Sequence, residues 1–384
     1  MKCSEVGIDQ VAKMTVLREK DNLFEGGHSN IAPANAVNKC ILTLTRCCTQ
    51  NCDFCAVDAI APLSEINCLR DCAANAVKEQ EIGHELTFDQ WQKVIDNLLL
   101  IDENMEFDLS GGDCLALPWV RNKFMPFLLE KVGDNKRVSI TATAVSLRAW
   151  LDEIRKTNMP FLPGNIHITY DGYRPYSFDN LALVNPLREI GVDVHAECPL
   201  TVDNCSHTMV ERIYKEMLDY QISEVLLMRF FPVGRGAKSG QSNPWEPTSS
   251  QYIDAIAEFQ RLSKMHPHGP KVKLQCALKE YTLESRGYAL CKMGKSTWCV
   301  MPNGDVLICP WAYGMNGNAL DPSFVAGNAL DSPEFIVKQS SLLIHAQYKE
   351  APGKCKVLKF GKNKINAFEH DRQDDHLSCR GVEA

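Results

Sequence analysis

The fold is decided by residues 48–55, CTQNCDFC, in which three cysteines follow one another at a C-x3-C-x2-C spacing. The apolar run ILTLT at residues 41–45 comes just before and predicts a buried strand, so the cysteines lie on a loop after that strand. Closely spaced thiols in this setting fit one metal cluster better than a disulfide set. A [4Fe-4S] cluster usually takes four thiolate ligands. Three cysteines would therefore leave one iron open to a small molecule.

A structural zinc site is the alternative interpretation of the same loop. Zinc sites usually combine two C-x2-C-like pairs into a closed tetrahedron. Cys47 could add a fourth thiolate, but adjacent cysteines rarely point to one ion. The motif alone favours the cluster, and the rest of the chain has to agree.

Together with Phe54 before the last cysteine, the loop resembles the cluster-binding loop of the radical S-adenosylmethionine (SAM) superfamily. The resemblance implies a [4Fe-4S] cluster on Cys48, Cys52 and Cys55, with SAM bound to the open iron through its amine and carboxylate. An electron from the cluster would cleave SAM to methionine and a 5'-deoxyadenosyl radical, which takes a hydrogen atom from the substrate. The cofactor supplies the difficult chemistry, and the protein supplies placement and exclusion of water.

Composition sets broad limits on the protein. The 384 residues, 45% of them hydrophobic and 23% charged, suit a soluble globular chain with one large core and a small second domain. The net charge of -7 argues against a general nucleic-acid binder. Residues 1–22 lack the apolar stretch of a signal peptide, and no run reaches membrane-spanning length.

The chain contains 17 cysteines. Since no export signal is found, we expect a cytoplasmic protein whose thiols stay reduced. Many cysteines in that compartment indicate metal binding or catalysis rather than a disulfide scaffold.

Strands and helices are predicted to alternate after the cysteine loop. The predicted strands cover residues 39–45, 106–110, 138–144, 165–171, 192–200 and 224–231. The predicted helices cover residues 86–100, 118–131, 146–156, 180–190, 207–218 and 249–264. Apolar strands that alternate with helices favour an α/β fold with a parallel sheet covered on both faces. The resemblance implies a partial (β/α)6 TIM-type barrel over residues 39–266, after an N-terminal extension at 1–38.

The connection at residues 56–85 is unusually long and contains Cys68 and Cys72, which share one face if the segment is helical. They could be an extra ligand pair or part of a lid. A helical insertion with two small buried thiols is the favoured interpretation.

The second predicted strand ends in SGGD at residues 110–113. Glycines at a strand end let the backbone approach a ligand closely. The run resembles the Gly-Gly-Glu motif of the family, which implies that Ser110, Gly111 and Gly112 hold the amine of SAM. Asp113 stands where the family has Glu and is one methylene shorter, so the resemblance carries over the backbone role, with Asp113 as a further candidate for contact with SAM.

The fourth predicted strand ends in ITYDG at residues 168–172. This run resembles the Ile-Ser-Leu-Asp-Gly run of the SPASM/twitch branch of the superfamily. The resemblance implies that Thr169 contacts SAM and that Asp171 faces the mouth of the barrel as a catalytic acid or substrate contact. An ordinary Asp-Gly turn is the alternative. Glu197, at the end of the next strand, is a weaker candidate for a SAM contact.

The sixth predicted strand ends in RFFPVGRG at residues 229–236, which resembles the Pro-x-Gly-Arg run of that branch. The resemblance implies that Phe230, Pro232 and Val233 wall the adenine of SAM. Arg229 or Arg235 could hold a carboxylate, and Arg235 is also a candidate catalytic residue. Solvated surface arginines are an equally good alternative.

Cysteines return in residues 267–384 around the run WCVMPNGDVLICP at residues 298–310, where Asn-Gly predicts a hairpin. Cys291, Gly304 and Cys309 match the C-x(9–15)-G-x4-C signature of the SPASM/twitch auxiliary domain. The resemblance implies an auxiliary [4Fe-4S] cluster on the cysteines of this region. The expected ligands are Cys291, Cys309 and Cys355, with a fourth position that is open or filled by Cys299 or Cys379. A zinc knuckle is the alternative.

These features together predict a radical SAM oxidoreductase with an auxiliary cluster that accepts an electron. The branch implies a peptide substrate that is oxidised or cross-linked in natural-product maturation. The alternative substrate is a small sugar-like or nucleoside intermediate, and a zinc-stabilised binding protein without catalysis is the competing class. Expected partners are a flavodoxin- or ferredoxin-type electron donor and a separate leader-peptide-binding protein, with no nucleic acid and no membrane.

Overall fold

The computed structural model describes residues 37–157, 162–237, 243–281, 294, 296–350, 355–358 and 360. The predicted N-terminal extension therefore lies outside the described residues except at positions 37 and 38.

A single mixed sheet forms the centre of the described part of the chain. Its ten strands follow the order β10–β9–β8–β1–β2–β3–β4–β5–β6–β7. Neighbours from β8 through β1 to β7 are parallel, and β9 and β10 are antiparallel. The bounds are β1 Lys39–Thr43, β2 Glu106–Ser110, β3 Val138–Ala142, β4 Asn165–Thr169, β5 Asp193–Pro199, β6 Glu224–Met228, β7 Lys271–Leu274, β8 Thr297–Val300, β9 Asp305–Leu307 and β10 Val325–Asn328.

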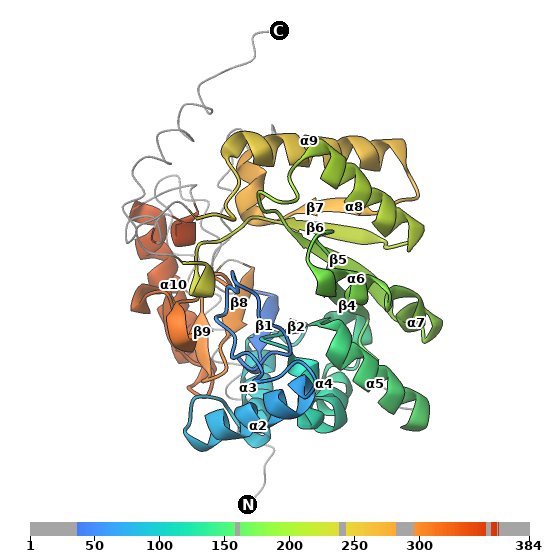
Figure 1. Cartoon of the computed structure of the whole chain (residues 1–384). Helices are drawn as coiled ribbons and strands as arrows, with labels where there is room; N and C mark the ends of the chain where they lie inside the picture. The colour runs from blue at the N-terminus through green and yellow to red at the C-terminus, as the bar shows by residue number, and fades with distance from the viewer. Residues whose placement is uncertain are drawn as a thin grey trace, which may run out of the picture.

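Helices follow most of the parallel strands. Figure 1 shows β1 to β7 along an arc, with the helices on its outer side. The helices are α2 Cys68–Glu81, α3 Phe88–Ile101, α4 Met125–Val132, α5 Ala144–Thr157, α6 Pro175–Leu181, α7 Val184–Glu189, α8 His207–Asp219, α9 Ser249–Met265 and α10 Pro333–Glu350. The predicted α/β class and the alternation of strands with helices are confirmed.

Local sequence explains where these elements begin and which face they bury. Along β4, Ile166 and Ile168 are buried while their neighbours are half-buried, which is the alternation of a strand with one apolar face. Helix α3 begins after Thr87, which forms a capping box with Gln90. The side chain of Trp91 on the same helix is fully buried in the core. Apolar side chains between sheet and helices therefore form the main core.

One prediction for this part of the chain needs correction, and one strand was not predicted. The single helix predicted at residues 180–190 is two helices, α6 and α7. Pro186 explains the break, because a proline lacks the N–H of a helix interior and fits only in the first turn of α7. The strand β7 was not predicted: its sequence KVKL is short and leaves both lysines exposed.

The predicted Asn-Gly hairpin is confirmed as β8 and β9, with Gly304 at a φ of 90° in the turn. The hairpin does not stand apart from the sheet, because β8 pairs with β1 over Lys39–Leu42. Residues from the C-terminal third of the chain thus lie directly beside the strand that leads to the cysteine loop.

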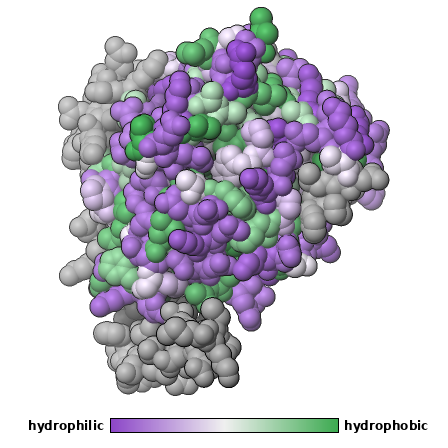
Figure 2. Space-filling model, turned by 90° about the horizontal axis from the view of Figure 1, so that it is seen from below, coloured by the Kyte–Doolittle hydropathy of each residue, from purple (hydrophilic) through white to green (hydrophobic). Residues whose placement is uncertain are grey.

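One face of the molecule is seen in the space-filling view of Figure 2. Figure 2 shows hydrophilic residues over most of the face seen from below, with smaller hydrophobic areas between them. Among the described residues no helix is both long and apolar enough to cross a membrane.

Candidate functional site

A cavity of about 200 Å³ lies at the carboxyl ends of the parallel strands. Each strand from β1 to β6 contributes a residue at or just after its end. These residues are Cys48, Gly112, Thr143, Thr169, Pro199 and Met228. Ligands of parallel α/β sheets bind at this edge. The predicted strand-end motifs therefore meet around one space.

The three cysteines of the C-x3-C-x2-C loop, Cys48, Cys52 and Cys55, all line this cavity. Backbone N–H groups point at two of the sulfurs, from Gln50 to Cys48 at 3.4 Å and from Ala59 to Cys55 at 3.4 Å. Hydrogen bonds of this kind to ligand sulfurs tune iron–sulfur clusters. The three cysteines can thus present three thiolates to one metal group.

The distances between the sulfurs of Cys48, Cys52 and Cys55 argue against a zinc site. The three sulfurs do not all lie within 4.8 Å of one another. A tetrahedral zinc with sulfurs at about 2.3 Å would hold them at roughly 3.8 Å apart. A larger group such as a cluster fits the loop better. Burial raises the pKa of the Cys48 and Cys55 thiols, so a metal bound here would have to stabilise their thiolate forms.

Asp113 anchors the cysteine loop rather than lining the cavity. It is fully buried, and its carboxylate accepts hydrogen bonds from Thr49 at 2.6 Å, Thr143 at 2.7 Å and Ser146 at 2.6 Å. Burial raises the pKa of Asp113, and the three hydroxyl donors oppose that shift. Asp113 thus connects the cysteine loop to the end of β3 and to the start of α5.

The glycines before Asp113 allow close approach of the two loops. A side chain on Gly112 would place its Cβ 2.2 Å from the carbonyl oxygen of Cys47. The Gly112 N–H donates to the Thr45 carbonyl at 2.8 Å, and Gly111 has a φ of 137°. Ser110 keeps only a backbone contact here, accepting from Leu44 at 3.1 Å. These contacts set the position of the cysteine loop.

Glu85 supports the start of the cysteine loop from behind, and no sequence pattern pointed to it. It is 2% exposed and accepts hydrogen bonds from the Thr45 hydroxyl at 2.9 Å and the Arg46 N–H at 2.7 Å. Burial raises the pKa of Glu85 to about 7. Its second oxygen has no hydrogen-bond partner among the described residues, which is less costly for a neutral carboxyl than for a carboxylate.

Arg174 is the cation at the cavity wall beside the cysteines, and sequence reasoning missed it. Its guanidinium lies 4.7 Å from the ring centre of Phe54 and 4.8 Å from that of Tyr176. The Tyr176 hydroxyl lies 3.1 Å from the Cys52 sulfur. The sequence run Tyr-Arg-Pro-Tyr after the Asp-Gly turn was the available signal for this group.

Asp171 holds Arg174 in place. It is fully buried, and its carboxylate accepts from the Arg174 side chain and from the N–H groups of Tyr173 at 3.3 Å and Arg174 at 3.2 Å. It is not among the residues that line the cavity. The predicted mouth residue therefore lies behind Arg174 and not at the mouth.

Thr169 lines the cavity at the end of β4. Its carbonyl accepts from the Asn180 side chain at 2.8 Å, and the same amide accepts from the Ala144 N–H at 2.7 Å. Asn180 thus joins the end of β4 to the start of α5. Glu197 does not line the cavity, and its carboxylate pairs with His167 at 3.5 Å.

Aromatic side chains form another wall of the cavity. Phe54 and Phe230 pack with ring centres 5.8 Å apart, and Phe231 stacks on Trp311 at 4.9 Å. The Arg229 guanidinium lies 5.3 Å and 5.4 Å from the ring centres of Tyr252 and Tyr281, and these two rings stack on each other. All except the two tyrosines line the cavity. The predicted Pro232 and Val233 are buried but do not line it.

Arg235 forms hydrogen bonds to the outer side of the cysteine loop. Its backbone N–H donates to the Cys55 carbonyl at 2.9 Å, and its side chain donates to Asn51 at 2.5 Å. It also pairs with Asp58 at 3.4 Å. Asp58 in turn accepts from the Asn316 N–H at 2.6 Å, so the loop is tied to the C-terminal region. Arg235 does not line the cavity.

The predicted auxiliary-cluster cysteines are partly described. Cys291 and Cys379 lie outside the described residues, whereas Cys309 follows β9 and Cys355 precedes a helical turn at 356–358. The Gly294 N–H donates to the Ile308 carbonyl at 2.7 Å, and the Ile308 N–H donates to the Phe324 carbonyl at 3.0 Å.

The rings of Phe324 and Phe360 pack 5.7 Å apart. Since Cys309 follows Ile308 and Cys355 comes shortly before Phe360, these contacts place the two cysteine-bearing segments in one region. Cys299 has different contacts: its sulfur lies 2.9 Å from the Tyr313 hydroxyl and 3.4 Å from that of Thr43. Burial raises the pKa of Cys299 to about 11.

The long connection forms α2, and its thiols are buried. Cys68 and Cys72 are 7% and 0% exposed. A hydrogen bond with Cys47, together with burial, raises the pKa of Cys72. The structure thus places Cys47 against Cys72, and all three thiols within the packing of α2.

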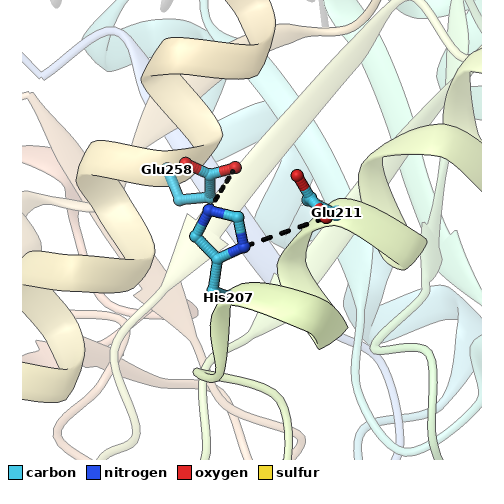
Figure 3. Close-up of side chains that lie close together, drawn as sticks. All are labelled: His207, Glu211 and Glu258. Atoms are coloured by element: carbon cyan, nitrogen blue, oxygen red, sulfur yellow. Dashed lines mark ion pairs between the residues drawn. The ribbon is translucent and has the colours of Figure 1, made fainter.

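Another group of possible metal ligands lies outside the cavity, between α8 and α9. Figure 3 shows His207 between Glu211 and Glu258, at 3.8 Å and 3.2 Å. Arg261 pairs with Glu258 at 2.5 Å and with Glu211 at 3.4 Å. Because the Arg261 guanidinium already pairs with both carboxylates, we interpret this group as an ion-pair network that joins two helices.

Comparison with known proteins agrees with this arrangement at the level of the fold. No protein-family model matches the sequence, and no curated protein does. Among solved structures, SuiB of Streptococcus suis bound to S-adenosylmethionine is similar with a TM-score of 0.57 and 12% identity, over 85% of this chain and 69% of that one. SuiB bound to its precursor peptide SuiA gives a TM-score of 0.53 and 12% identity, over 86% of this chain and 76% of that one.

Native anSMEcpe with bound AdoMet and the Cp18Cys peptide gives a TM-score of 0.56 and 11% identity, over 90% of this chain and 99% of that one. At these identities the likeness concerns the fold. The predicted resemblance to the SPASM/twitch branch of radical SAM proteins is confirmed at that level.

The raised pKa of Glu85 predicts a pH-dependent stability. Between about pH 4.5 and about 7 the folded protein holds a proton that the unfolded chain releases, so the free energy of unfolding falls as the pH rises through this window. The decrease amounts to about 3 kcal/mol and should be missing in Glu85→Gln, which keeps the acceptor oxygen. Urea unfolding at both ends of the window measures it, with the exposed Glu81→Gln as control. An equal pH dependence in Glu85→Gln and the wild type would contradict the assignment.

Proposed function

We propose that this protein is a radical SAM enzyme that binds a [4Fe-4S] cluster on Cys48, Cys52 and Cys55. The observation that carries the proposal is the meeting of these three thiols and the strand-end motifs around one cavity. When bound, the cluster supplies the electron that cleaves SAM and so generates the radical that takes a hydrogen atom from the substrate. The similarity of the fold to SuiB and anSMEcpe, both of which have been solved with bound SAM, supports the proposal.

Different residues of the chain would hold different parts of SAM. The Gly112 backbone and Thr169 offer polar groups at the strand ends next to the thiols. Arg174 offers a guanidinium for the carboxylate, and its fork geometry suits that group. Phe54 and Phe230 offer apolar faces for the adenine. Aromatic walls of this kind also exclude water from the reacting atoms.

The proposal extends to the architecture. Strands β1 to β6 with their helices correspond to the partial (β/α)6 barrel, and the hairpin β8–β9 begins the twitch-like part. The parallel pairing of β8 with β1 supports a fixed position of that part beside the cysteine loop.

We assign an auxiliary [4Fe-4S] cluster to Cys309, Cys355 and Cys291. The backbone and ring contacts between Gly294, Ile308, Phe324 and Phe360 support the assignment, because each cysteine is within a few residues of one of them. Cys379 or a small molecule fills the fourth position better than Cys299, whose sulfur is engaged with Tyr313 and Thr43. The auxiliary cluster would accept the electron left on the substrate.

A peptide is the substrate class we propose, to be oxidised or cross-linked. SuiB has been solved with its precursor peptide SuiA, and anSMEcpe with the Cp18Cys and Kp18Cys peptides. A flavodoxin- or ferredoxin-type protein would supply electrons, and a separate protein would present a leader peptide. A reducing cytoplasm would protect such clusters.

The iron content of the protein tests whether the three cysteines hold a cluster. Anaerobic reconstitution should load the wild type with iron and sulfide and give the electron paramagnetic resonance signal of reduced [4Fe-4S] clusters. Replacing Cys48, Cys52 and Cys55 with Ala should remove about four irons, because that is one cluster's content. Cys205→Ala is the control, since it removes a buried thiol away from the cavity. Zinc in place of iron, or an unchanged iron count in the triple variant, would reject the assignment.

Removing the support of Arg174 should weaken SAM binding. In Asp171→Asn the buried carboxylate no longer fixes the guanidinium, and the loss of a hydrogen bond to a charged group corresponds to roughly ten- to hundredfold in affinity. Equilibrium dialysis with SAM measures the change. Asp179→Asn is the matched control, because Asp179 pairs with Arg148 on the surface. SAM affinity that stays at the wild-type value in Asp171→Asn would show that Arg174 does not hold SAM.

The auxiliary cysteines should separate the two cluster functions. We expect Cys309→Ala with Cys355→Ala to lose about four irons and to keep cleavage of SAM, since the first cluster remains. Oxidation of the substrate should stop, because the electron on the substrate then lacks an acceptor. Iron analysis and 5'-deoxyadenosine formation measure the two effects. Full iron content in the double variant would mean that these cysteines hold no cluster.

A further inference from the structure

Each of the three loop sulfurs lies within hydrogen-bond distance of a polar group, and the group beside Cys52 differs from the other two. The sulfurs of Cys48 and Cys55 accept from backbone N–H groups of the same segment of chain. The Cys52 sulfur instead lies 3.1 Å from the side-chain hydroxyl of Tyr176. A backbone donor is built into the loop, whereas a side-chain hydroxyl depends on the identity of one residue. The proposed function uses the three thiols and gives Tyr176 no role.

The chemistry of a metal ligand decides the direction of the contact between Tyr176 and Cys52. A free thiol could donate to the tyrosine oxygen. A cysteine that binds a metal is a thiolate, which has no hydrogen to donate. A phenol hydroxyl keeps its hydrogen at neutral pH and can donate it. In the loaded protein the Tyr176 O–H would therefore donate to the Cys52 sulfur.

Tyr176 is held with its hydroxyl at the cavity. It lies in the first turn of α6, directly after Arg174 and Pro175. The Arg174 guanidinium lies 4.8 Å from the centre of the tyrosine ring, and the buried Asp171 carboxylate in turn holds that guanidinium. Tyr176 lines the cavity together with Cys52. The contact with the sulfur is thus part of a supported arrangement of side chains.

We propose that Tyr176 raises the reduction potential of the cluster on the three loop cysteines by donating its O–H to the Cys52 sulfur. Reduction adds negative charge to the cluster and its sulfurs, so a hydrogen-bond donor stabilises the reduced form more than the oxidised form. A higher potential makes the cluster easier to reduce. The inference rests on the proposed function and deepens it, because it names a residue that controls how readily the electron enters the site.

Tyr176→Phe tests the inference, because it removes the hydroxyl and keeps the ring beside Arg174. Tyr173→Phe is the matched control: its ring centre also lies near Arg174, at 5.9 Å, but its hydroxyl accepts from Thr201 at 3.3 Å. The full-length proteins are reconstituted anaerobically without SAM. A redox titration followed by electron paramagnetic resonance gives the midpoint potential. The signal that is missing from the triple Ala variant of the loop cysteines belongs to this cluster.

We expect a more negative potential in Tyr176→Phe and an unchanged potential in Tyr173→Phe. Loss of a hydrogen bond to a charged group can change an equilibrium by about tenfold, which for the transfer of one electron corresponds to about 59 mV. Iron content should stay at the wild-type level in both variants. Electron nuclear double resonance of the reduced cluster, after exchange into heavy water, should show one coupled exchangeable hydrogen fewer in Tyr176→Phe than in the wild type.

The outcomes separate this inference from the proposed function. A potential of Tyr176→Phe equal to that of the wild type, or an equal shift in Tyr173→Phe, would overturn the inference. Loss of iron from Tyr176→Phe would overturn it too, since the tyrosine would then hold the cluster rather than tune it. So would a wild type whose reduced cluster couples to no exchangeable hydrogen. A wild type that holds no cluster rejects the proposed function itself, whereas an unshifted potential in a loaded variant rejects the role of Tyr176 alone.

Discussion

The buried carboxylate of Asp113 is the interaction on which the arrangement of the site depends. It accepts hydrogen bonds from the cysteine loop, from the end of β3 and from the start of α5. Hydrogen bonds to a charged group contribute about 1.5–3 kcal/mol each, so this residue contributes strongly to holding the cysteine loop in place. Because Gly112 brings the backbones within contact distance, a side chain one methylene shorter than glutamate suffices. The cost of burying the charge is offset only while all three hydroxyl groups are in place.

The second constraint is the continuity of the sheet. The hairpin β8–β9 extends the sheet beside β1, and Trp311 from the segment after it stacks on Phe231 after β6. Asp58 and Asn316 connect the long loop to the same region. The cavity is therefore walled by residues from both ends of the described chain. Any electron transfer between the two proposed clusters would occur across a packed interface rather than a flexible linker.

The sequence predicted those features that depend on local pattern. The C-x3-C-x2-C loop, the alternation of strands and helices and the Asn-Gly hairpin all leave signals within a few residues, and the fold confirms them. Position at a strand end also predicted that Gly112, Thr169 and Phe230 meet in one cavity. Pattern could not reveal which way a polar side chain turns. Asp171 was expected at the mouth, but it lies behind Arg174, and only tertiary contacts decide this. Glu85 was missed for the same reason, because its partners Thr45 and Arg46 come from a distant loop.

Cleavage of SAM is the most direct test of the account. The protein is reconstituted anaerobically, reduced with dithionite and given SAM, and the products are separated by liquid chromatography with mass detection. The account predicts 5'-deoxyadenosine and methionine in equal amounts, formed only when the cluster is present. A fully loaded protein that yields neither product would contradict the claim that the cavity is a radical SAM site.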